Sequence, residues 1–305
     1  MRLVKTFVLI TLLIAAFSAG CVEEDTQVAS ADEFFETSRY DEAIVSYDKI
    51  LEREPGNIDA LNSKGESLNA LSRYDEAIEC YDKAIDIEPE NAMAWVNKGD
   101  SLLELSGYDE ALECYERAIE IDPEFYTAWS GKGCVLYSLD RYNESIEYFG
   151  KSIECSDKAI DSDAENILAW YEKGLSLSYL EEYNNSIECY NRTIEINPEF
   201  VYGWYGKGTS LLYLERYDEA VECYDKAIGI SPGFAYSWDC KGYALTELGR
   251  YDEAVECYDR AIEINPEYAY AWEGKGYALD ELGRSDEASE CYKKVEELIS
   301  PLLEI

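Results

Sequence analysis

The stretch AMAWVNKGDSLLELSGYDEALECYERAIEIDPEF, residues 92–125, decides the fold of this chain. In its first half, Ala92 to Leu105, apolar residues recur at spacings of three and four, as on one face of a helix. The second half, Tyr108 to Ile121, repeats this spacing after a Ser-Gly turn signal. Pro123 then ends the second helix, because proline lacks a backbone donor and disfavours helical geometry in the residue before it. The stretch therefore predicts a pair of helices, which we call helix A and helix B of a repeat.

The phrase that opens helix B, Tyr-Asp-Glu-Ala-Ile or a close variant, returns eight times along the chain. Successive copies are 34 residues apart, except for one interval of 41 residues. A fixed period of this size indicates stacked copies of one unit, each too small to bury its own apolar face. The copies begin at Arg39, Arg73, Gly107, Arg141, Glu182, Arg216, Arg250 and Arg284.

This pattern resembles the tetratricopeptide repeat. The family's signature falls on Trp95, Gly99, Ala111, Tyr115, Ala118 and Pro123. The resemblance implies an all-α fold, a right-handed superhelical solenoid of about eight helix-turn-helix repeats. Departures occur at Gln27 and Leu61, which stand where the tryptophan belongs, and at the lysine that precedes each glycine, as in Lys98. The lysine variant is similar to tetratricopeptide arrays of methanogenic archaea.

The long interval predicts where the array is interrupted. Its seven extra residues are close to two helical turns, so helix B of repeat 4 is expected to lengthen by about 10 Å and to end at Asp161-Ser-Asp163. This divides the array into repeats 1 to 4 and repeats 5 to 8. The predicted segments are a signal peptide at 1–20, a lipid-anchored tether at 21–29, repeats 1 to 3 at 30–125, repeat 4 at 126–166 and repeats 5 to 8 at 167–302.

The first residues have the organisation of an export signal. Met1 to Lys5 is basic, Phe7 to Phe17 is apolar apart from one threonine, and small residues precede Cys21. The end of this segment resembles the lipobox of prokaryotic lipoproteins, which implies that Cys21 carries a lipid after cleavage. The sequence thus predicts an exported protein, held on the outer face of the cell membrane by its N-terminal lipid. The alternatives are an uncleaved anchor and a cytoplasmic protein.

Composition excludes several classes of function. The chain has 65 acidic and 26 basic residues, no histidine and a net charge of −39, so it repels nucleic acids. Histidine-based catalytic triads are impossible, and no glycine-rich phosphate loop or metal-ligand spacing is found in the sequence. We therefore expect no enzymatic activity, no cofactor and no metal.

Three asparagines, Asn143, Asn184 and Asn191, begin Asn-X-Ser/Thr sequences and are candidate glycosylation sites. The alternative is structural, because asparagine replaces aspartate well at the start of a helix.

Tyrosines dominate the inner positions of helix A in repeats 5 to 8. The resemblance implies that helix A lines a concave groove, and the predicted groove residues are Tyr171, Tyr179, Tyr202, Tyr205, Tyr213, Tyr236, Tyr243, Tyr270 and Tyr277. Tyrosine offers a large contact area and a polar tip at little entropic cost. Neighbouring carboxylates favour a basic or aromatic peptide as the partner. The alternative is that these rings only cover neighbouring helices.

Two further features bear on recognition. Lysine and asparagine hold a peptide carboxylate in some members of the family, but Glu66, Asp100 and Glu172 stand at or near those positions here. The row of lysines before the glycines suggests anion binding, or else each stem packs beside a tryptophan while its amine reaches a carboxylate.

The leading function is that of a membrane-tethered scaffold that binds a polypeptide. The alternative is a structural envelope component that self-associates through the C-terminal repeat, whose tail, Leu298 to Ile305, is largely apolar. A sugar-binding role is a third possibility.

Overall fold

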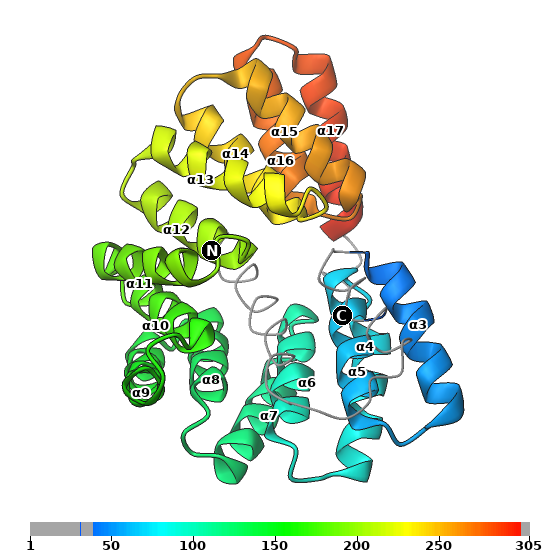
Figure 1. Ribbon diagram of the computed structural model, residues 1–305. Helices are drawn as coiled ribbons and strands as arrows, with labels where there is room; N and C mark the ends of the chain where they lie inside the picture. Colours follow the sequence, from blue (N-terminus) through cyan, green and yellow to red (C-terminus); the bar gives the residue numbers. More distant parts are fainter. Residues whose placement is uncertain (1–30, 32–38, 300–305) are drawn as a thin grey trace. The chain divides into compact units, whose positions relative to one another are not determined.

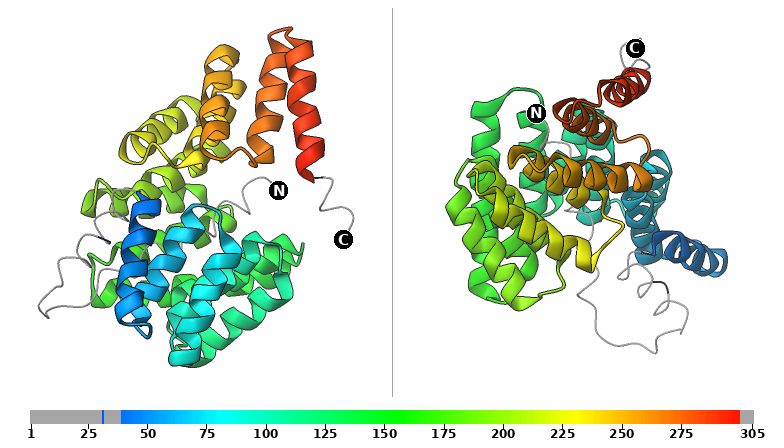
Figure 2. Two further views of the ribbon diagram at one scale, coloured as in Figure 1. Left: turned by 90° about the vertical axis from the view of Figure 1, so that its right-hand side faces the viewer. Right: turned by 90° about the horizontal axis from the view of Figure 1, so that it is seen from above.

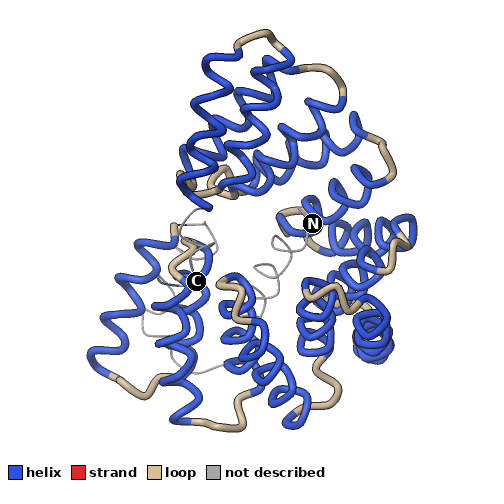
Figure 3. The backbone as a smooth tube through the Cα atoms, turned by 180° about the vertical axis from the view of Figure 1, so that it is seen from behind, coloured by secondary structure: helices blue, strands red, loops and turns tan. Residues whose placement is uncertain are grey.

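The computed structural model describes Ala31 and residues 39–299. All regular elements in this part of the chain are α-helices, and they follow one another in packed pairs (Figures 1 and 3). The predicted all-α repeat fold is therefore confirmed. The predicted signal peptide, Cys21, the tether, Gln27 and the last residues of the tail lie outside the described residues. None of the helices in residues 39–299 combines the length and hydropathy that a membrane span requires.

The chain divides into two compact units, unit 1 ending at Leu180 and unit 2 beginning at Glu181. The described helices of unit 1 are α3 (Tyr40–Arg53), α4 (Ile58–Ala70), α5 (Tyr74–Ile87), α6 (Ala92–Glu104), α7 (Tyr108–Ile121), α8 (Tyr126–Ser138), α9 (Tyr142–Ser162) and α10 (Ile167–Tyr179). Those of unit 2 are α11 (Tyr183–Ile196), α12 (Val201–Tyr213), α13 (Tyr217–Ile230), α14 (Ala235–Glu247), α15 (Tyr251–Ile264), α16 (Ala269–Glu281) and α17 (Ser285–Ile299). Even-numbered helices are the A helices and odd-numbered ones the B helices. Figure 2 shows such a pair, α16 beside α17.

A buried tyrosine of helix B forms the centre of most repeats, and Phe149 takes its place in repeat 4. Tyr115 is fully buried between two A helices, where Gly99 of α6 and Gly131 of α8 leave room for its ring. A Cβ atom at Gly131 would lie 2.3 Å from Cε1 of Tyr115. Packing against the tyrosine ring thus explains the signature glycine of helix A, Gly99 in this repeat, which we call the close-contact glycine. Equivalent rings are those of Tyr47, Tyr81, Tyr190, Tyr224 and Tyr258.

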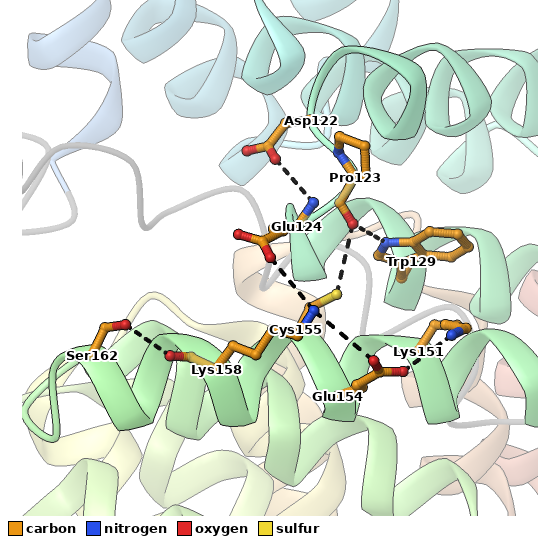
Figure 4. A network of polar contacts seen from close by, with 9 residues as sticks. All are labelled: Asp122, Pro123, Glu124, Trp129, Lys151, Glu154, Cys155, Lys158 and Ser162. Carbon is orange, nitrogen blue, oxygen red and sulfur yellow. Dashed lines mark hydrogen bonds and ion pairs between the residues drawn. The ribbon is translucent and has the colours of Figure 1, made fainter.

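Helix α9 is 21 residues long, whereas the B helix before it, α7, has 14 residues. It ends at Ser162, and Asp163 is its C-cap. In Figure 4 the added turns lie against the loop between α7 and α8: the Cys155 thiol contacts the Pro123 carbonyl at 3.7 Å, and Lys158 pairs with Glu124 at 3.4 Å. The extended end of α9 is therefore held against the loop between α7 and α8.

The boundary between the two compact units lies inside repeat 5. The sequence divides the array between repeats 4 and 5, and α10, the A helix of repeat 5, belongs to unit 1. Two contacts explain this. The ring of Tyr179 stacks on Phe149 with centroids 4.6 Å apart, and Ser130 Oγ donates to a carboxylate oxygen of Glu172 at 2.7 Å. Both contacts bind α10 to the preceding repeat.

Candidate ligand-binding face of the A helices

The lysines before the glycines are neutralised within the fold. All but one of them reach an acidic residue sixteen positions earlier on the preceding B helix, as Lys98 reaches Asp82 at 2.6 Å. The lysine amine also lies 6.0 Å from the ring centre of Trp95, whose indole N–H donates to the Pro89 carbonyl. This confirms that the stems pack beside the tryptophans while the amines reach carboxylates. The other pairs are Lys64–Asp48, Lys132–Glu116, Lys173–Asp157, Lys241–Asp225 and Lys275–Asp259.

One lysine departs from this arrangement. Lys207 of α12 lies 5.8 Å from the ring centre of Trp204, but the position sixteen residues earlier is Asn191. Within residues 39–299 no carboxylate lies within ion-pair distance of Lys207.

Replacing Asn191 by Asp should therefore create the missing ion pair with Lys207. The pair would resemble the partly exposed pair Lys241–Asp225, so the expected gain in unfolding free energy is small, about 0.5 kcal/mol. Urea unfolding of the two proteins at low and high salt measures it. The variant Lys207→Gln, combined with Asn191→Asp, is the control and should show no gain.

The Ser and Thr residues of the three predicted glycosylation sequences lie inside the fold. Ser145, Ser186 and Thr193 are buried, and the Ser145 and Thr193 hydroxyls donate to backbone carbonyls of their own helices. Asn143 and Asn184 are each the second residue of a B helix. Helix packing alone therefore explains why serine, threonine and asparagine stand at these positions. Glycosylation of the three asparagines stays a prediction.

Buried polar side chains line the A helices of unit 1. On α6, Asn97 donates to the Glu66 carboxylate of α4 at 3.1 Å, and Ser101 donates to Asn69 at 3.0 Å. All four side chains are nearly or fully buried. Buried polar groups of this kind cost free energy unless they are hydrogen-bonded. These hydrogen bonds therefore help to fix how α6 packs against α4.

Two fully buried carboxylates continue this polar row. Asp100 of α6 accepts a short hydrogen bond from the Tyr115 hydroxyl, and Glu172 of α10 accepts one from Ser130. The second oxygen of Glu172, Oε1, has no hydrogen-bond partner. The pKa of Glu172 is raised to about 8, because burial, helped by the charge of Asp100, outweighs the lowering effect of the hydrogen bond from Ser130.

Unit 2 carries an aromatic ladder in place of a polar row. We use this name for Phe200, Tyr202, Phe234, Tyr236, Tyr268 and Tyr270, whose rings contact one another in that order at centroid distances of 5.2 to 5.9 Å. Every contact is edge-to-face, which is a favourable arrangement of aromatic rings. The ladder therefore holds its tyrosines in fixed positions across three A helices.

The predicted groove tyrosines fall into three groups. Tyr171, Tyr202 and Tyr205 are buried, and Tyr179 is stacked on Phe149. These four rings cover neighbouring helices, and a groove lined by them stays a prediction. Tyr236, Tyr243 and Tyr270 are partly exposed, and Tyr213 and Tyr277 are 43% and 50% exposed. The surface open to a partner is made by these five.

Sequence reasoning missed half of the aromatic ladder. Phe200, Phe234 and Tyr268 immediately precede the A helices and alternate with the helical tyrosines. Their signal is visible in hindsight, because each follows a helix-ending proline by two residues, as in Pro198-Glu-Phe200. Among residues 39–299 no group of histidine, cysteine, aspartate and glutamate has the geometry to hold a metal ion.

Comparisons with known proteins agree with this architecture. Models described as tetratricopeptide repeat match residues 57–124, 96–160, 167–200, 201–234 and 269–300, and a model described as TPR repeat matches residues 242–283. No curated protein matches the chain in sequence. None of these matches bears on the resemblance to archaeal arrays.

Two solved structures are among those similar to this chain, and the first of them supports the similarity of fold. A chain in the crystal structure of the APC/C hetero-tetramer Cut9-Hcn1 is 17% identical, with a TM-score of 0.64 over 90% of this chain and 53% of that one. Our chain thus spans about half the length of that relative. A crystal structure of MamA is 20% identical, with a TM-score of 0.49 over 57% of this chain and 97% of that one.

Proposed function

This chain belongs to the tetratricopeptide repeat family, and from that premise we propose that it is a non-catalytic scaffold that binds a polypeptide partner through the A helices of unit 2. The family and the fold support protein binding. The location on unit 2 and the chemistry of the partner are our proposal.

The observation that carries the proposal is the aromatic ladder. Its outer rings, Tyr236 and Tyr270, are partly exposed yet are fixed by edge-to-face contacts with Phe234 and Tyr268. Because these rings are ordered before a partner arrives, little side-chain entropy is lost on binding. Rigid, amphipathic rings of this kind are typical of recognition surfaces.

Charge favours a partner with basic residues. Asp239 lies within the ladder region, where it accepts a hydrogen bond from Tyr268 at 3.1 Å. Carboxylates also lie near a tyrosine farther along unit 2. The pKa of Tyr217 is raised by desolvation and then by the negative charges of Glu247 and Glu215. With a net charge of −39 on the chain, a cationic peptide is attracted to these tyrosines and an acidic one is repelled.

The test replaces Tyr213, Tyr243 and Tyr277 together by Ala. Two of these rings are exposed and none is a member of the ladder, so the fold should be retained, as circular dichroism can show. We expect the yield of the partner cross-linked in the native host to fall at least tenfold, since several contact rings are lost. The control is Tyr142→Ala in unit 1, a ring that is 49% exposed and lies on a B helix. A second variant replaces the outer ladder rings, Tyr236 and Tyr270, by Ala. Equal capture by the wild type and by both variants would rule out this surface.

We further propose that the scaffold is exported and held at the membrane through Cys21. The support is the basic, apolar and small-residue order of residues 1–21. Cys21→Ser, expressed in the native host, should move the protein from the membrane fraction to the soluble fraction. Cys240→Ser, which changes a cysteine of unit 2, should leave the protein in the membrane fraction. A Cys21→Ser protein that stays in the membrane fraction would rule out the lipid anchor.

A further inference from the structure

The aromatic ladder of unit 2 is built from three copies of one five-residue motif. Each copy has a helix-ending proline, any residue, an aromatic residue, any residue and a second aromatic residue. The copies are Pro198-Glu-Phe-Val-Tyr202, Pro232-Gly-Phe-Ala-Tyr236 and Pro266-Glu-Tyr-Ala-Tyr270. The first ring of each copy immediately precedes an A helix, and the second ring is the second residue of that helix.

Successive copies of this motif are joined in a constant way. The first ring of one copy packs on the second ring of the copy before it. Phe234 packs in this way on Tyr202, with 5.6 Å between the ring centroids, and Tyr268 packs on Tyr236 at 5.2 Å. The residue that would pack on Tyr270 by the same rule belongs to the segment that follows α17.

The sequence after α17 contains the motif once more, in an aliphatic form. Pro301-Leu-Leu-Glu-Ile305 has Leu303 and Ile305 at the two ring positions. The distance from the preceding helix is also the same. Residues 231–233 separate the end of α13 from Phe234, and residues 300–302 separate the end of α17 from Leu303. Both the proline and the end of the helix therefore put Leu303 in register with Phe234 and Tyr268.

We propose that residues 300–305, which lie outside the described residues, dock on unit 2 of the same chain and add a rung to the ladder. Leu303 packs on the ring of Tyr270 as Tyr268 packs on Tyr236. A leucine side chain on this ring removes apolar surface from water and needs no hydrogen-bond partner.

A docked tail leaves the face of the A helices open. Tyr236 shows this, because its ring is partly exposed although both Phe234 and Tyr268 contact it. Tyr270 is also partly exposed and should stay so with Leu303 in place. The docked tail is therefore compatible with the binding surface proposed for unit 2 and does not depend on it.

Two arguments favour the chain's own tail over the tail of a second copy as the occupant. The tail is joined to α17 by as many residues as the loop that carries Phe234 in unit 2, so docking within the chain closes only a short loop. A second copy would bring another net charge of −39 to the same place, and this repulsion opposes association.

The test replaces Leu303 of the full-length chain by the photoreactive amino acid benzoylphenylalanine, whose rings resemble the aromatic residues at this position of the other copies. After irradiation we expect a cross-link to α16 within one chain, identified by mass spectrometry of its peptides. The control carries the same amino acid at Leu302, which corresponds to the exposed residues Glu199, Gly233 and Glu267. Its yield of this product should be about fivefold lower, because its side chain lies outside contact distance of the ladder.

A second pair of variants tests the contact with Tyr270. In the protein labelled at position 303, Tyr270→Ala should lower the yield of the cross-link about threefold, because the ring that holds the tail is lost. Tyr277→Ala, which removes a half-exposed ring from the same helix, should leave the yield unchanged.

Three results would overturn the proposal. A cross-linked product of twice the chain mass as the main product would mean that a second copy takes up the tail. Equal yields from positions 302 and 303 would mean that the tail has no fixed register on the ladder. A protein labelled at position 303 that gives no cross-link to α16 would exclude the contact altogether. Capture of a partner by the Tyr213, Tyr243 and Tyr277 triple variant is a separate measurement, so the docked tail and the proposed function can fail independently.

Discussion

Replacing Glu172 by Gln should raise the free energy of unfolding by about 3 to 5 kcal/mol at pH 9 and by less than about 1 kcal/mol at pH 5, in the absence of a partner. The substitution keeps the shape of the side chain and an oxygen that can accept from Ser130. It removes the need to ionise a fully buried group. Chemical unfolding of the two proteins between pH 5 and pH 9 measures the difference.

The sign of this effect follows from the raised pKa of Glu172, about 8 in the folded chain against 4.5 for an ordinary glutamate. Below pH 4.5 both the folded and unfolded states carry the proton, and the stability linked to this group is fully present. As the pH rises towards 8 the unfolded state releases its proton while the folded state keeps it, so that stability is progressively lost. Glutamine does not titrate, and its variant escapes this loss.

The control for this prediction is Glu165→Gln, whose exposed side chain should leave the unfolding free energy almost unchanged at every pH. At pH 9, where both carboxylates are ionised in the folded chain, the two variants change its overall charge equally, so self-repulsion cancels when they are compared. If the gain from Glu172→Gln were the same at pH 5 and pH 9, the carboxylate would not be buried as described.

The repeat fold could be predicted from the sequence because its signal is redundant. The tryptophan, the close-contact glycine and the helix-ending proline recur at fixed spacing, and each has a local physical reason in the structure. Trp95, for example, donates to the Pro89 carbonyl and thereby fixes the loop between two repeats. When local preferences and long-range packing agree at so many positions, the fold is strongly specified.

The exposure of single side chains could not be predicted in the same way. Tyr205 and Tyr277 occupy inner positions of helix A, yet Tyr205 is fully buried and Tyr277 is half exposed. The difference lies in neighbours that are remote in sequence, because Phe234 of the next repeat packs edge-to-face on Tyr205 at 5.2 Å. Helical periodicity assigns a residue to a face of its helix, but it does not say what covers that face.

The buried carboxylates illustrate the same limit. The sequence places Glu66, Asp100 and Glu172 on A helices, but an acidic residue on a highly acidic chain suggests a solvated surface. Their burial arises because A helices of successive repeats contact one another in unit 1, as the hydrogen bond from Asn97 to Glu66 shows. This contact joins residues 31 positions apart and has no counterpart in any local pattern.

Gly131→Ala should destabilise the chain by about 3 kcal/mol, although alanine is the better helix former. The new Cβ would lie 2.3 Å from Cε1 of Tyr115, well inside van der Waals contact. The ring has nowhere to move, since Gly99 of α6 closes its other side and its hydroxyl is bonded to Asp100. The backbone of α8 must therefore shift away from α7, which disrupts packing between two repeats. The urea midpoint followed by circular dichroism measures the loss.

Gly150→Ala is the matched control, because it makes the same change inside a helix, α9, where a Cβ would meet nothing within 4 Å. At Gly150 only the helix preference of alanine over glycine remains, so the free energy of unfolding of this variant should rise by about 0.5 to 1 kcal/mol. Opposite signs for the same substitution would locate the effect at the Tyr115 ring. The ring can also be tested directly: Tyr115→Leu should cost less stability in the Gly131→Ala protein than in the wild type, because the smaller side chain relieves the collision. If the two substitutions were simply additive, the ring and the glycine would not be in contact.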